Sequence, residues 1–143
     1  MDKLLVKEAL FTFLQTIYKF EQIELDKFSV SWQEILLLKH LTIHKECNMG
    51  LIATTLNIKP FQATRLVDGL IKKQLITRFT SENDRRVKSI SITKKGISRL
   101  DEVDDFHHLI IENAAKDLGT KHTTEILKMM FYLEKLLGLS NNK

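Results

Sequence analysis

The residues best suited to chemistry lie in the stretch 81–86, SENDRR, where Asp84, Arg85 and Arg86 stand between two β-prone runs. Guanidinium groups on an exposed hairpin tip can bind an anion through charge-assisted hydrogen bonds. An alternative is that the tip is charged only because it is solvated. The surrounding residues must decide between an anion-binding tool and an ordinary polar loop.

Basic residues are concentrated around this loop. Residues 54–96 contain ten basic and three acidic residues, a net charge of +7, whereas the rest of the chain has 12 basic and 15 acidic residues, a net charge of −3. A basic middle between acidic ends is a candidate footprint for a polyanion such as a nucleic acid. Charge alone is weak support, because lysine-rich faces are often only solvated.

Histidine and cysteine offer a second kind of chemistry. His40 and His44 are spaced i, i+4, as are His108 and Glu112, and Cys47 follows the first pair closely. Zinc sites have a denser Cys/His signature than this. We therefore expect no metal and no cofactor, and we expect Cys47 to be structural or incidental. A metal-responsive regulator is kept as an alternative.

Catalysis has no sequence support. We find no glycine-rich phosphate loop, no nucleophile elbow and no metal triad, so we expect that the protein is not an enzyme. The 143 residues are 43% hydrophobic and 28% charged, as in one globular domain. A single cysteine, no signal-peptide core and no membrane-length apolar run predict a cytoplasmic protein.

The first expected helix covers residues 4–25 and has two apolar stripes. One stripe can pack on the chain's own core, but a second stripe needs another partner, and self-association is the simplest explanation. The first stripe contains Val6, Ala9, Leu10, Phe13, Ile17 and Phe20. The second contains Leu4, Phe11, Leu14 and Tyr18.

Three shorter helices are expected next. Ser31 and Glu34 fit a capping box that opens a helix ending near residues 42–44, and Asn48 can cap a short helix over 49–56. Pro60 suits the first position of the following helix. That helix should bury the stripe Ala63, Leu66, Val67 and Leu70 and expose Phe61, Arg65, Asp68 and Lys72. Two helices joined by residues 57–59, the second with a basic outer face, indicate a helix-turn-helix.

The period then changes from helix to strand. Residues 75–80 and 87–92 are β-prone, and residues 81–86 join them as a hairpin. Thr93 starts a long helix that Gly119 should break. Ile126, Met130, Leu133 and Leu137 predict one final helix at heptad-like spacing. The expected fold class is mainly α with a small two- to three-stranded β wing (α+β).

This order of elements resembles the MarR family of winged helix-turn-helix transcription regulators. The resemblance is carried by residues 56–60 (LNIKP), 64–68 (TRLVD), 70–73 (LIKK), 75–78 (LITR), 84–86 (DRR) and 91–96 (SITKKG). It is specific over residues 31–100 and generic over the outer helices.

The resemblance implies a single domain over residues 1–143 that forms an entwined homodimer. Residues 1–30 and 97–143 would supply the dimerisation helices, and residues 31–96 would form the DNA-binding region. The protein would be a sequence-specific repressor of a pseudo-palindromic double-stranded operator, released by a small aromatic effector. The alternative is a winged-helix protein-interaction or dimerisation module without specific DNA binding.

The resemblance also assigns site residues. The recognition helix would enter the major groove and the wing the minor groove, with Asp84 orienting an arginine there. Lysines 59, 72, 88 and 95 would be phosphate neighbours or solubility charges. Trp32 and His40 are candidates for the effector site. The recognition-helix candidates are Lys59, Pro60, Phe61, Gln62, Thr64 and Arg65, and the wing candidates are Asp84, Arg85, Arg86 and Lys88.

Three departures from the family pattern affect these expectations. Gln74 stands where a glycine usually closes the recognition helix, so the turn must form without the residue that adopts a left-handed conformation most easily. Gly69 replaces a common basic residue and reduces the positive charge of the face. Lys59 and Phe61 replace small hydroxyl residues, so the base preference need not follow that of any relative.

Overall fold

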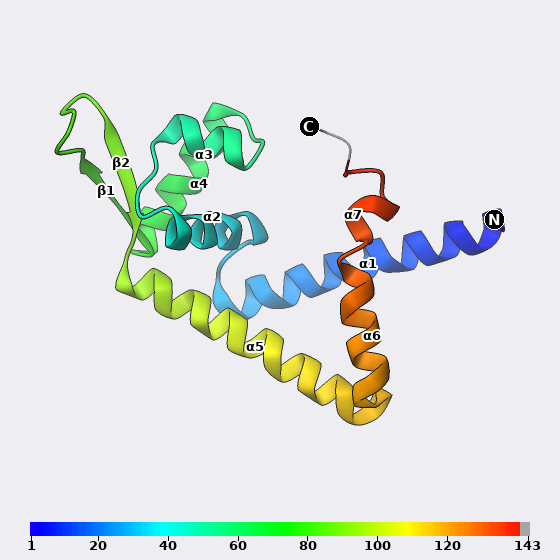
Figure 1. The fold of residues 1–143 in the computed structure, drawn as a ribbon. Coiled ribbons are helices and arrows are strands. Elements are labelled where there is room, and N and C mark those ends of the chain that lie inside the picture. The colour runs from blue at the N-terminus through cyan, green and yellow to red at the C-terminus, as the bar shows by residue number, and fades with distance from the viewer. Residues whose placement is uncertain (141–143) are drawn as a thin grey trace. The chain divides into compact units, whose positions relative to one another are not determined.

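The computed structural model describes residues 1–140, and Figure 1 shows their order along the chain. The chain divides into two compact units, Met1–Val103 and Asp104–Lys143. The single-domain assignment therefore stays a prediction. The elements are α1 (Lys3–Phe28), α2 (Trp32–Ile43), α3 (Met49–Thr55), α4 (Pro60–Lys72), β1 (Ile76–Thr80), β2 (Lys88–Ile92), α5 (Lys94–Leu118), α6 (Thr120–Met130) and α7 (Leu133–Leu136).

Helix α1 is longer than predicted at its C-terminal end. Asp2 caps its start by accepting the Leu4 N–H at 2.8 Å, and Ser29 ends it in the left-handed region, with φ of 56°. Residues of both predicted stripes are exposed to solvent, among them Leu4, Val6, Phe11, Leu14, Ile17 and Tyr18. The chain by itself therefore leaves much of the apolar surface of α1 uncovered.

Helix α2 supplies much of the core of the first unit. The predicted capping box is confirmed: the Glu34 N–H donates to Ser31 Oγ at 3.2 Å, and the Ser31 N–H donates to Glu34 Oε2 at 2.7 Å. The helix ends at Ile43, as expected. Its buried apolar side chains are Ile35, Leu37, Leu38 and Leu41.

The helix-turn-helix forms as predicted. Asn48 caps α3 by accepting the Leu51 N–H at 2.8 Å, and Pro60 occupies the first turn of α4. Asn57, in the connection, takes φ of 51°, a left-handed conformation that asparagine tolerates better than most residues. Ala63, Val67 and Leu70 of α4 are fully buried, whereas Leu66, the fourth member of the predicted stripe, is only half-buried.

The wing is an antiparallel pair with a one-residue third strand. Strands β1 and β2 pair in the register Ile76↔Ile92 through Thr80↔Lys88. Cys47 forms an isolated bridge with Ile90, with N···O distances of 3.0 and 2.8 Å. The hairpin follows α4, and β1 packs against that helix (Figure 1). The predicted fold class, with a two- to three-stranded wing, is confirmed.

The second unit begins within α5. Gly119, with φ of 82°, ends this helix as predicted. The expectation of one uninterrupted final helix is wrong, because α6 stops at Met130 and α7 begins at Leu133. Between them, the N–H groups of Phe131 and Tyr132 bond to carbonyl oxygens three residues back, which tightens the turn and interrupts the α-helical ladder.

A helix that crosses a membrane must be both long and apolar. No helix within residues 1–140 combines the length and the apolar character that such a crossing requires.

Candidate nucleic-acid interface

The outer face of α4 exposes the side chains predicted to contact DNA. Lys59, Pro60, Gln62, Thr64 and Arg65 are all exposed. Phe61 is also exposed, over 57% of its surface, which is unusual for a phenylalanine beside a well-packed core. The buried stripe of the same helix anchors it, so the exposed side chains project from a fixed support.

Two of these side chains, Gln62 and Thr64, form hydrogen bonds to the backbone at the start of the helix. Gln62 Oε1 accepts the Lys59 N–H at 2.9 Å, which caps the start of α4 and leaves the Gln62 amide NH₂ able to donate outward. Thr64 Oγ1 donates to the Pro60 carbonyl at 3.1 Å. The Arg65 guanidinium lies 5.9 Å from the centroid of the Phe61 ring. Arg65 is thus an exposed cationic side chain that lies beside the exposed Phe61 ring.

The C-terminal end of α4 closes in a Schellman motif with glutamine in place of glycine. Gln74 takes φ of 62°, the Leu75 N–H donates to the Leu70 carbonyl at 3.0 Å, and the Gln74 N–H donates to the Ile71 carbonyl at 2.9 Å. Thr93 Oγ1 donates to the Gln74 carbonyl at 2.7 Å. Neighbouring contacts therefore hold the left-handed turn that the sequence makes difficult.

Two lysines with undecided roles are engaged within the protein. Lys95 Nζ donates to the Lys73 carbonyl at 3.1 Å, and Lys88 Nζ donates to Thr80 Oγ1 at 3.0 Å at the last paired position before the hairpin loop. Lys95 thus lies at the end of α4, where a cation favours the helix terminus. On the outer side of the same helix, Arg78 of β1 pairs with Asp68 at 3.2 Å. Both partners are exposed, so this ion pair adds little to stability.

The wing tip places Asp84 against the backbone rather than against a guanidinium. Asp84 Oδ1 accepts the Arg86 backbone N–H at 2.9 Å, and the Asp84 carbonyl accepts the Val87 N–H at 3.0 Å. The expectation that the Asp84 carboxylate holds an arginine side chain is therefore wrong in this structure. A short aspartate in a turn reaches the N–H two residues ahead more easily than a long side chain. The side chains of Arg85 and Arg86 are exposed.

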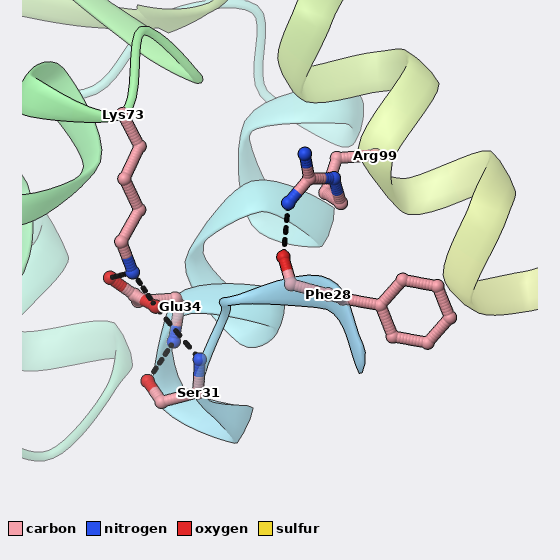
Figure 2. Close-up of polar contacts among 5 residues, drawn as sticks. All are labelled: Phe28, Ser31, Glu34, Lys73 and Arg99. Atoms are coloured by element: carbon pink, nitrogen blue, oxygen red, sulfur yellow. Dashed lines mark hydrogen bonds and ion pairs between the residues drawn. The ribbon is translucent and has the colours of Figure 1, made fainter. Parts of the chain in front are cut away.

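An ion pair that the sequence did not suggest joins α2 to the end of α4 (Figure 2). Lys73 Nζ lies 2.7 Å from both carboxylate oxygens of Glu34. Figure 2 also shows the Arg99 guanidinium of α5 donating to the Phe28 carbonyl at the end of α1. The capping box accounts for Glu34, but no local spacing links it to a lysine 39 residues later.

An open pocket of about 470 Å³ lies beside this ion pair, within the first unit. The candidate effector residues Trp32 and His40 do not line it. Its walls come from α1, the start of α2 and the outer side of α4: Leu25, Ser31, Gln33, Glu34, Phe61, Gln62, Arg65, Leu66 and Lys73.

Trp32 and His40 lie on α2, eight residues apart. Trp32 is partly exposed, whereas His40 is half-buried. The His40 ring lies 4.5 Å from the His44 ring, and burial, followed by the neighbouring His44, lowers the pKa of His40. Within residues 1–140, Nε2 of His40 is buried and has no hydrogen-bond partner.

The thiol and histidine chemistry is limited by this geometry. Cys47 is buried, and burial together with the carboxylate of Glu46 raises the pKa of its thiol, which disfavours the reactive thiolate. His108 pairs with Glu112 at 3.8 Å on an exposed face. Across the described part of the chain, no three His, Cys, Asp or Glu side chains gather closely enough to hold a metal ion.

Comparison with known proteins places this geometry in context. Residues 30–88 match the model of the MarR family. The chain is 28% identical over 139 residues to an uncharacterized HTH-type transcriptional regulator of Bacillus subtilis (strain 168), YhbI, and the match covers 94% of this chain and 86% of YhbI. It is 32% identical over 79 residues to the HTH-type transcriptional repressor MdtR of the same organism, covering 55% of this chain and 51% of MdtR.

A solved structure supports the fold. The MepR–DNA complex of S. aureus superposes with a TM-score of 0.68 at 22% sequence identity, and the match covers 92% of this chain and 97% of the MepR chain. At that identity the likeness establishes the fold.

Proposed function

We propose that this chain, which belongs to the MarR family of transcriptional regulators through residues 30–88, is a dimeric, sequence-specific double-stranded DNA-binding regulator. The observation that carries the proposal is the exposure of arginines on two adjoining elements. Arg65 projects from α4, and Arg85 and Arg86 project from the β1–β2 hairpin that packs beside it. The MepR structure, of the same fold, is a complex with DNA.

Helix α4 is proposed to enter the major groove. Arg65 would donate to a guanine edge, and the NH₂ of Gln62 would donate to a base acceptor or a phosphate. Lys59, at the start of the helix, would contact the phosphate backbone of the DNA. The exposed ring of Phe61 would contact a thymine methyl group, an apolar contact that a hydroxyl residue could not provide as well.

The wing is proposed to lie along the minor groove next to this site. Arg86 would enter the groove, where A·T-rich sequences narrow it and deepen its negative potential. Arg85 would pair with a phosphate. Asp84 would act by shaping the turn, since its carboxylate already accepts the Arg86 N–H.

The active form is proposed to be a homodimer. In the first unit α1 exposes a long apolar face, and in the second unit α6, α7 and the residues between and after them expose another. The residues of the second face are Ile126, Met129, Met130, Phe131, Tyr132, Leu136, Leu137 and Leu139. Two-fold symmetry would give a pseudo-palindromic operator with half-sites about one helical turn, roughly 10 bp, apart.

Repression relieved by a small aromatic effector is the proposed regulation. MdtR, which matches over about half of this chain, is a repressor. His40 is the best-supported effector residue, because its buried Nε2 lacks a partner within residues 1–140 and could accept a hydrogen bond from a phenolic hydroxyl. Trp32, at the start of α2, offers a partly exposed ring for stacking.

The proposal is tested by selecting DNA from a random pool and then titrating the selected site at two salt concentrations. We expect a two-fold symmetric consensus and a steep dependence of affinity on salt. Arg65→Ala should weaken the selected site by about 1–3 kcal/mol while sparing nonspecific DNA. A protein that selects no consensus and binds DNA without salt dependence would instead be an interaction module.

A further inference from the structure

We infer that the Glu34–Lys73 ion pair positions the recognition helix for DNA, with Lys73 acting through Glu34 rather than on a phosphate. This inference rests on the proposed DNA-binding function. Glu34 belongs to the first turn of α2, and Lys73 caps the C-terminal end of α4. The pair therefore joins the start of one helix to the end of the other.

The carboxylate of Glu34 accepts more hydrogen bonds than the capping box alone requires. It is only 7% exposed, and it accepts the Ser31 N–H at 2.7 Å as well as Lys73 Nζ at 2.7 Å on both oxygens. A buried carboxylate is stable only when its charge is paired and its oxygens are bonded. Lys73 is thus the charge partner that lets Glu34 stay buried, which fixes where the lysine side chain must point.

The main chain of Lys73 is held from a second side. Its carbonyl oxygen accepts Lys95 Nζ at 3.1 Å, and the next carbonyl, of Gln74, accepts Thr93 Oγ1 at 2.7 Å. Both donors lie at the start of α5. The end of α4 is therefore fixed between α2, through the Lys73 side chain, and α5, through the backbone.

The same cluster reaches the end of α1. Arg99, on α5, donates to the carbonyl of Phe28, three residues before Ser31 in the chain (Figure 2). Polar contacts thus run from α5 to the α1–α2 turn, and from that turn through Ser31 and Glu34 to Lys73. A displacement of α1 or α5 would be passed to the recognition helix through these bonds, whereas the rest of α4 is held by the apolar packing of its buried stripe and by the exposed Asp68–Arg78 ion pair.

Charge separates this role from a phosphate contact. Lys73 and Arg65 line the same pocket, and Glu34 neutralises the charge of Lys73. Among the described residues Arg65 has no ion-pair partner, so its charge remains available to an anion. A lysine already bonded at 2.7 Å to a carboxylate would have to leave it to meet a phosphate. Replacing Lys73 should therefore change how well the protein discriminates between DNA sequences, without changing how many phosphates it neutralises.

The test compares wild type with Lys73→Met, Glu34→Gln and the double variant on the selected operator and on unrelated DNA. Glu34→Gln keeps an oxygen to accept the Ser31 N–H, so the cap of α2 survives while the charge is lost. Lys72→Met is the matched comparison, because Lys72 is an exposed neighbour on α4 without the Glu34 contact. Whether or not Lys72 meets a phosphate, its loss should leave the ratio of specific to nonspecific affinity unchanged. Denaturation of each variant identifies conditions in which all are folded.

We expect each single variant to lower the ratio of specific to nonspecific affinity by about tenfold, and the double variant to lose no more than either single one, because both remove the same contact. The salt slope of Lys73→Met should equal that of wild type. A slope reduced by about one unit per protomer would make Lys73 a phosphate contact and overturn the inference. If the variants distinguish the operator from unrelated DNA as well as wild type does, the inference is overturned while the proposed function stands. If wild type itself has no preferred site, the proposed function is overturned as well.

Discussion

The carboxylate of Asp84 accepts the backbone N–H of Arg86 at 2.9 Å, so an acidic residue shapes the tip of a basic hairpin. The Asp84 carbonyl also accepts the Val87 N–H, and the Ser81 N–H donates to the Val87 carbonyl at 3.0 Å. These bonds close the loop into a turn of defined shape. The negative charge of Asp84 is thus incidental to its bond, because a neutral acceptor of the same length could form it.

Asp84→Asn and Asp84→Ala should therefore behave differently. Asparagine keeps an acceptor for the Arg86 N–H and removes a negative charge beside the proposed phosphate path, so DNA affinity should stay equal or rise. Alanine removes the bond, worth about 1 kcal/mol, and should lower affinity by roughly fivefold. Titration of the selected operator measures both. If alanine tightened binding as much as asparagine does, Asp84 would be only a repulsive charge.

Replacing each of the two wing arginines should change DNA binding in a different way. Arg86→Ala should flatten any A·T preference next to the half-sites, because an arginine in the minor groove gains most where the groove is narrow. Arg85→Ala should lower affinity for all sequences and reduce the salt slope by about one unit per protomer. Selection from a random pool and salt titration of each variant make the comparison. Identical behaviour of the two variants would argue against a division of roles.

Local sequence signals predicted the elements well, because each signal acts within one turn of chain. Ser31 and Asn48 set helix starts by accepting N–H groups three residues ahead, and Pro60 does so through its fixed φ at the first turn. The break between α6 and α7 escaped prediction, since residues 131 and 132 include neither glycine nor proline. An apolar series at heptad spacing does not report whether the backbone between its members remains helical.

The exposure of the candidate site residues could be predicted from the sequence, but the contacts that connect them to the rest of the fold could not. Exposed positions on α4 and on the wing follow from periodicity and turn chemistry. The Glu34–Lys73 pair and the Cys47–Ile90 bridge join residues far apart in sequence, and no spacing rule indicates such pairs. The bond of Asp84 was misassigned for the opposite reason: the attraction between opposite charges suggested a side-chain partner where the nearer backbone N–H was available.

Two helical glycines should respond in opposite ways to alanine. A Cβ on Gly69 would lie 3.6 Å from Glu34 Oε1, an ordinary contact, so Gly69→Ala should stabilise the protein by up to about 1 kcal/mol through helix propensity. A Cβ on Gly96 would overlap the Leu75 carbonyl oxygen and lie 2.7 Å from Ile92 Cγ1. Gly96→Ala should cost about 1–3 kcal/mol or more. Chemical denaturation at one protein concentration compares the free energies of unfolding of the two variants. If both substitutions destabilise the protein, the conclusion that a Cβ fits at Gly69 is wrong.

Gln74→Gly should stabilise the fold. Glutamine at φ of 62° carries the steric cost of the left-handed region, about 1–2 kcal/mol, whereas glycine adopts it freely but loses about 0.5–1 kcal/mol through a more flexible unfolded chain. The net gain should be about 0.5–1 kcal/mol. Gln74→Asn should fall between the two, since asparagine tolerates this conformation, and Gln74→Ala should give no gain. Thermal or chemical denaturation ranks the variants. A Gln74→Gly variant less stable than wild type would show that contacts of the glutamine side chain outweigh the strain.

The last prediction concerns self-association through α1. Phe11 is 67% exposed and Tyr18 is 63% exposed on one side of this helix. Exposing this apolar surface to water is unfavourable, and packing against a partner copy would bury it. In a symmetric dimer each buried aromatic side chain counts twice, at roughly 1.5–3 kcal/mol per copy, so Phe11→Glu should raise the dimer dissociation constant at least about 100-fold. Thr12→Glu, an exposed neighbour outside both apolar stripes that adds the same charge, should leave the dimer intact. Sedimentation velocity measures assembly, and circular dichroism checks that the helices remain. A wild-type protein that sediments as a folded monomer at micromolar concentration would contradict the dimer. A Phe11→Glu dimer as tight as wild type would place the contact away from this face of α1.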